Sequence, residues 1–90
     1  MSMAIIGGNE CMERRYIDIC KQFGYTAKVF AKPKGIREKI GSPDVVVLFT
    51  NTVSHKMVNQ TLSSINKNKS KIIRIHSSSI SSLKNILEAM

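Results

Sequence analysis

Three side chains that can act as nucleophile, base or metal ligand stand in short polar stretches of this sequence: Cys11, His55 and His76. A thiolate beside an imidazole can carry out covalent catalysis. The same two groups are also ligands for zinc and for haem iron. No two of the three residues stand at the local spacing of a metal motif, so any joint role depends on a fold that brings them together.

The rest of the chain alternates between short apolar runs and amphipathic segments. Apolar runs that do not alternate with polar residues predict strands buried on both faces, which we expect at residues 3–6 and 45–49. Two further strands are expected at residues 27–30 and 71–76, which are rich in apolar residues. Apolar residues at helical spacing behind capping residues predict helices, which we expect from Asn9 to Gly24, at 36–40, from 54 to 65 and from 80 to 90.

Strands and helices in strict alternation predict an α/β fold with a parallel sheet and right-handed crossovers. The simplest layout is a small three-layer Rossmann-like half fold, in which a four-stranded sheet of order 2-1-3-4 lies between helices on both faces. A chain of 90 residues has room for one core, so we expect a single Rossmann-like domain over residues 1–90.

This topology predicts a site where the segments after strands 1, 3 and 4 meet, because ligands of open α/β sheets bind at the carboxyl ends of the strands. Helix N-termini at that edge favour an anion, and an arginine in the first helix can supply charge. The predicted ligand-binding residues are Gly7, Gly8, Asn9, Cys11, Arg14, Arg15, Thr50, Asn51, Thr52, Ser54, His55, His76, Ser77, Ser78 and Ser79.

Structural roles are also open for many of these residues. The Gly7-Gly8 pair can simply let the first strand turn closely into its helix, and His76 can be a hydrogen-bonded structural histidine. Asn9, Asn51, Thr52, Ser78 and Ser79 are all residue types that cap helices. Cys20 lies on an apolar helical stripe and is expected in the core, whereas Cys11 stands at a helix start, where the dipole stabilises a thiolate.

The net charge and the composition limit the classes of molecule that we expect the chain to bind. Fourteen basic against six acidic residues give a net charge of +8, with basic clusters at residues 28–39 and 67–74. Such clusters can face nucleic acid phosphates, but no stacking platform, helix-turn-helix or zinc-finger pattern accompanies them. No apolar run approaches the ~20 residues of a membrane helix. Without a secretory leader or a disulfide framework, we expect a cytoplasmic protein that binds no membrane.

These features favour a small ligand-binding or sensing module for an anionic or polar molecule over a stand-alone enzyme. Two alternatives remain: a haem- or metal-binding or redox-sensing protein that uses Cys11, His55 or His76, and a phosphoryl or acyl transfer enzyme with Cys11 as nucleophile. A small core with two edge strands predicts a homodimer. Met57, off the apolar stripe of its helix, and Tyr16, bulky near the crevice, would supply surface for it.

Three stretches in order resemble the bacterial family called domain of unknown function 2325, over essentially the whole chain. They are Gly7-Gly8-x-x-Cys11-Met12-Glu13-Arg14-Arg15-Tyr16, Leu48-Phe49-Thr50-Asn51-Thr52-Val53-Ser54-His55-Lys56-Met57 and Arg74-x-His76-x-Ser78-Ser79. The resemblance implies a small cytoplasmic bacterial α/β domain. It implies no activity, because the family name assigns none.

Overall fold

The computed structural model describes residues 1–32, 35–65 and 69–89. Its elements are β1 (Ser2–Ile6), a single 3₁₀ turn η1 (Glu10–Met12), α1 (Glu13–Gln22), β2 (Thr26–Phe30), α2 (Ile36–Lys39), β3 (Val45–Phe49), α3 (His55–Ser64), β4 (Lys71–Ile75) and α4 (Ile80–Ala89). The predicted alternation of strands and helices is therefore confirmed. Parts of the expected breaks at Lys32–Gly35 and Asn66–Ser70, and the end of the last apolar stripe at Met90, lie outside the described residues.

The four described strands form one parallel sheet of order β2-β1-β3-β4, which confirms the predicted topology. Ile5 of β1 pairs with Val29 on one side and with Val47 on the other, and Val47 pairs in turn with Ile73 of β4. β3 is buried along its whole length, as its unbroken apolar run predicts for a central strand covered on both faces.

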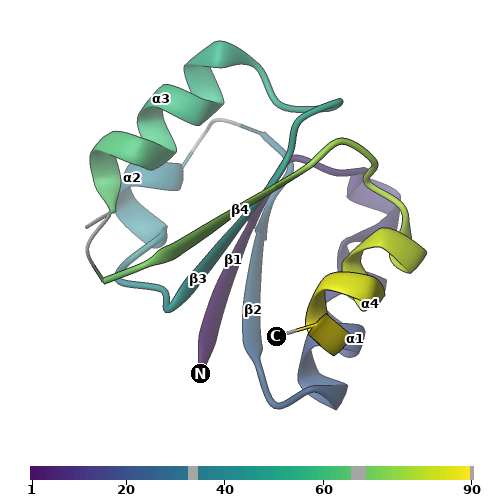
Figure 1. Cartoon of the computed structure of the whole chain (residues 1–90). Coiled ribbons are helices and arrows are strands. Elements are labelled where there is room, and N and C mark those ends of the chain that lie inside the picture. The colour runs from purple at the N-terminus through teal and green to yellow at the C-terminus, as the bar shows by residue number, and fades with distance from the viewer. Residues whose placement is uncertain (33–34, 66–68, 90) are drawn as a thin grey trace.

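Helices cover both faces of the sheet, α1 and α4 on one and α2 and α3 on the other (Figure 1). Successive residues of a strand point to opposite faces, so Met3 and Ile5 of β1 join the core under α1 and α4. Ala4 and Ile6 join the core under α2 and α3. Each face therefore has its own apolar core, and the carboxyl ends of all four strands lie at the same edge of the sheet (Figure 1).

The buried face of α3 agrees with the predicted one at Thr61 and differs from it at Met57. Met57, expected off the apolar stripe, is only 3% exposed and packs in the core under α2 and α3. Thr61, one turn later, is also buried. Its hydroxyl is satisfied there because it donates to the carbonyl of Met57 at 2.8 Å. Val58 is only half-buried. Since Tyr16 is also fully buried, neither side chain supplies the apolar surface expected for a partner.

None of the helices in the described segments is both long enough and apolar enough to cross a membrane.

Candidate functional site

The loops that follow β1, β3 and β4 meet at one edge of the sheet, which we call the rim: residues 7–12, 50–54 and 76–79. The backbone N–H of Thr50 donates to the carbonyl of Ile75 at 2.7 Å, and that of Asn51 donates to the carbonyl of His76 at 3.2 Å. The N–H of Gly8 donates to the Thr52 hydroxyl at 2.7 Å. Three segments far apart in sequence are thus held together by hydrogen bonds.

The two glycines after β1 make the close approach of these loops possible. Gly7 has φ +94°, and a Cβ there would lie 2.6 Å from Cγ1 of Val53 and 2.8 Å from Oγ1 of Thr52. Gly8 has φ +85°, and its Cβ would meet the ring of Tyr16 at 2.9 Å. Protein side chains therefore occupy the space beside both glycines, which supports their structural role in packing.

Tyr16 links the first helix to the loop after β4. Its hydroxyl donates to the carbonyl of Ser78 at 2.6 Å and accepts a long hydrogen bond of 3.5 Å from the N–H of Asn9. Its ring packs against Phe49 with a centroid distance of 5.4 Å. The sequence stretch that contains Tyr16 resembled the family, but only the structure shows that this side chain spans the rim.

Several polar side chains predicted to contact a ligand act as caps in the structure. Oδ1 of Asn9 accepts from the N–H of Cys11 at 2.9 Å, and Oγ of Ser54 accepts from the N–H of Met57 at 3.2 Å. Oγ of Ser79 accepts from the N–H of Ser82 at 3.2 Å. These bonds satisfy N–H groups at helix starts, so the capping role left open by the sequence is present at Asn9 and Ser79, while Ser54, expected as the first residue of its helix, is a further cap.

The two histidines remain at the surface of the rim. His55 is the first residue of α3, His76 follows β4, and both are exposed, as is Asn51. The chain has no acidic residue between Asp44 and Glu88, so no carboxylate side chain comes from the loops after β3 and β4. The N-termini of α3 and α4 open toward the same edge, and their first N–H groups have no partner within the helix.

Cys11, in the loop after β1, and Arg14 border a different part of the surface from the histidines. Both line a shallow hollow of about 430 Å³ whose walls belong to η1 and α1, together with Glu10, Glu13 and Asp18. Within residues 1–32, 35–65 and 69–89, no group of three His, Cys, Asp or Glu side chains is arranged to hold a metal ion. The structure therefore brings the loop backbones together without making a common metal site of Cys11, His55 and His76.

The second cysteine is a core residue, as predicted. Cys20 is fully buried, and its Sγ lies 3.5 Å from Sδ of Met3. Burial raises the pKa of the Cys20 thiol from 9.0 to about 11, because the apolar surroundings disfavour the thiolate. Cys20 is thus a neutral packing residue, while Cys11 is exposed.

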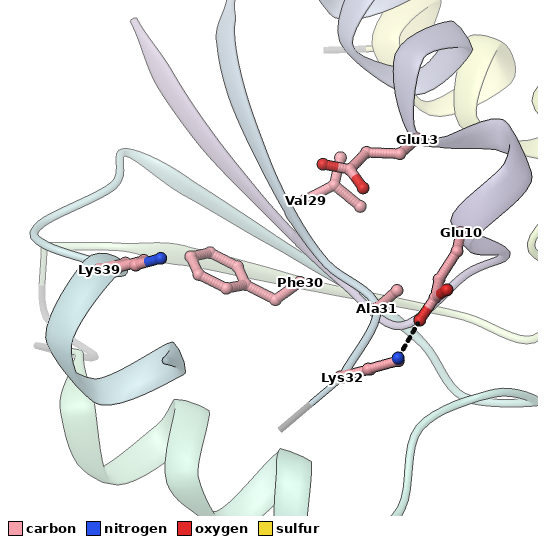
Figure 2. Close-up of a pocket in the computed structure, with 7 residues that line it drawn as sticks. All are labelled: Glu10, Glu13, Val29, Phe30, Ala31, Lys32 and Lys39. Atoms are coloured by element: carbon pink, nitrogen blue, oxygen red, sulfur yellow. Dashed lines mark ion pairs between the residues drawn. The ribbon is translucent and has the colours of Figure 1, made fainter. Parts of the chain in front are cut away.

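Larger hollows lie beside β2, one strand away from the predicted site. One of about 480 Å³ is lined by Val29 and Phe30 of β2, by residues that follow β2, and by charged side chains of both signs (Figure 2). Across its mouth, Nζ of Lys32 pairs with Oε1 of Glu10 at 3.1 Å. The predicted strand order already places β2 at an edge, but no residue pattern indicated these hollows.

Comparison with known proteins gives one family. The model of the family described as "Uncharacterized protein conserved in bacteria (DUF2325)" matches residues 2–90. Neither the curated proteins nor the solved structures gave a match.

Proposed function

The chain belongs to the DUF2325 family of uncharacterized bacterial proteins, and from the geometry of its rim we propose that it is a small ligand-binding module. Its ligand would be a small molecule with a phosphate or carboxylate group. The observation that carries the proposal is the pair of hydrogen-bonded loops after β3 and β4, which bring the N-termini of two ten-residue helices, one on each face of the sheet, to the same end of the strands. Helix N-termini offer N–H donors and a positive dipole end to an anion.

Charge supports an anionic ligand on this side of the sheet. All described acidic side chains before Glu88 come from η1, α1, α2 or the loop before β3. From Val45 to Leu87 every charged residue of the chain is basic. A ligand anion at the loops after β3 and β4 would therefore meet Lys56 and the two histidines without carboxylate repulsion from those loops.

The groups that would contact the anion follow from what the loops have left exposed. The hydroxyls of Ser54 and Ser79 already accept hydrogen bonds from backbone N–H groups. The exposed Asn51, His55 and His76 side chains, together with the N–H groups at the starts of α3 and α4 that no cap uses, are the groups we expect an anion to contact. Ser77 and Ser78 would shape the loop that carries His76. The carbonyl of Ser78 accepts from the Tyr16 hydroxyl, and the hydroxyl of Ser77 accepts from the N–H of Ser79 at 3.3 Å.

Calorimetric titration with pyrophosphate tests this proposal. We expect His76→Ala to weaken binding by about tenfold, the loss of one direct charge-assisted hydrogen bond. Lys21→Ala is the matched control, because Lys21 is an exposed cation in the last turn of α1, which ends near the amino ends of the strands and away from the rim. Binding that is absent, or that both variants weaken equally, would contradict a specific anion site at the rim.

A further inference from the structure

β2 presents unpaired backbone groups at one edge of the sheet. In its pairing with β1, the N–H of Thr26 donates to the carbonyl of Met1, and the carbonyl of Phe30 accepts from the N–H of Gly7, both at 2.8 Å. Because backbone groups alternate in direction along a strand, those of Ala27 and Val29 point away from β1. No described segment pairs with that outer side.

A groove runs along this open edge. The hollow of Figure 2 and a neighbouring one of about 570 Å³ share Glu13 of α1, Val29 and Phe30 of β2, and Lys39 of α2. Ile17 and Ala27 add apolar wall to the second hollow. The open edge of β2 therefore lies along a groove lined also by α1 and α2, where an added strand would find both backbone partners and side-chain contacts.

The charges around the groove are mixed, in a protein of net charge +8. Glu10, Glu13 and Glu38 line it, and so do Lys28, Lys32 and Lys39. The opposite edge differs, because β4 exposes Lys71 and Arg74 and carries no acid. A second copy of this chain would meet like charge at β4, which protects that edge from self-association, but would meet charges of both signs at β2.

We propose that this groove is the contact between two copies of the chain, with β2 of each copy pairing antiparallel across a two-fold axis to extend the sheet. A two-fold axis normal to the sheet makes identical edge strands antiparallel. Lys28 restricts the register of this pairing, because a two-fold axis through Lys28 would place the two Lys28 residues, which carry like charges, directly opposite each other. Nζ of Lys28 is turned to its own α2, where it donates to the carbonyl of Lys39 at 3.1 Å. This contact is independent of the anion site proposed at the rim.

Proline substitution tests the contact without breaking the sheet. Val29→Pro removes an N–H that points away from β1. Ile72→Pro is the matched control at the other edge: Lys71 donates to Asp44 and Ile75 accepts from Thr50, so the N–H of Ile72 points away from β3. Light scattering after gel filtration should give twice the 10.0 kDa chain mass for the wild type and for Ile72→Pro, and the chain mass for Val29→Pro.

A charge reversal provides a second test that leaves the backbone intact. Glu38→Lys changes an exposed side chain of the groove, and Lys71→Glu changes an exposed side chain of β4. Sedimentation analysis should show that Glu38→Lys raises the dimer dissociation constant by about tenfold or more, while Lys71→Glu does not. A wild-type chain that stays monomeric at all concentrations, or a dimer weakened only by the β4 variants, would overturn the proposal.

Discussion

The hydroxyl of Tyr16 in the first helix donates a 2.6 Å hydrogen bond to the carbonyl of Ser78, which is 62 residues further along the chain. The ring of Tyr16 is fully buried, where it packs against Phe49, and its hydroxyl makes hydrogen bonds to two loops of the rim. The same hydroxyl accepts from the N–H of Asn9. One side chain thus connects the loop after β1 with the loop after β4.

Tyr16→Phe should lower the free energy of unfolding by about 1–2 kcal/mol, because the Ser78 carbonyl loses its donor and the ring keeps its packing. Urea unfolding followed by circular dichroism measures this change. Tyr25→Phe serves as the control, since Tyr25 is a half-buried tyrosine at the margin of the same core. Equal losses in the two variants would show that the Tyr16 hydroxyl has no special part in joining the loops.

Gly7→Ala should destabilise the protein by about 2–4 kcal/mol, which combines the cost of a positive φ with overpacking against Val53 and Thr52. Gly24→Ala measures the cost of a positive φ without the overpacking. Gly24 has φ +85°, but nothing lies within 4 Å of the Cβ it would gain, so only about 1 kcal/mol is expected. If thermal unfolding gives the same loss for both variants, the close contact between the loops after β1 and β3 is not a source of stability.

Stability should fall between about pH 9 and about pH 11 because of Cys20. The pKa of its thiol is raised to about 11 in the folded chain, so the unfolded chain loses this proton first as pH rises. As pH rises, the state that binds fewer protons is favoured, so the free energy of unfolding falls. The fall is up to about 2–3 kcal/mol for a difference of about two pKa units. The contribution is fully present below about pH 9.

Cys20→Ala isolates this effect, since lysines and tyrosines titrate in the same range in both proteins. Urea unfolding at about pH 8 and about pH 10.5 should show a smaller loss of stability in the variant than in the wild type. An identical pH dependence would mean that the thiol has the same pKa folded and unfolded.

Arg15→Ala should weaken pyrophosphate binding more than Arg14→Ala does. Arg15 lies four residues before Ile19, which packs in the core shared with α4, so it is on the α4 side of α1. Arg14 lines the hollow with Cys11 and Asp18 instead. We expect about tenfold for Arg15 if its guanidinium contacts the anion directly, and little change for Arg14. The reverse order in calorimetric titrations would place the anion at the hollow beside Cys11.

The sequence predicts the sheet well because its signals are local. The uninterrupted apolar run of β3 indicates a central strand, and the alternation of elements is sufficient for the order β2-β1-β3-β4. Convergence of the loops after β1, β3 and β4 then follows from topology alone. The cap at Asn9 follows from residue type, since Asn9 precedes an apolar helical stripe, whereas residue type and spacing place Ser54 inside its helix and not at the cap.

The orientation of single side chains depends on features that a residue pattern does not contain. Cys11 lies in a 3₁₀ turn, whose three residues per turn change its direction relative to the stripe of α1. Met57, which apolar spacing placed off the stripe of its helix, is buried because α2 packs against α3. The Tyr16–Ser78 bond needs the packing of α1 against the sheet, which spacing along the chain does not specify.

Amide chemical shifts of ¹⁵N-labelled protein during a pyrophosphate titration test the anion site most directly. We expect saturable shifts for the backbone amides from Asn51 to Lys56 and from His76 to Ser81, at the starts of α3 and α4. Amides of Ala27 and Val29, at the open edge of β2, should stay unchanged. Saturable shifts confined to β2, or no saturable shifts at all, would contradict an anion site at the rim.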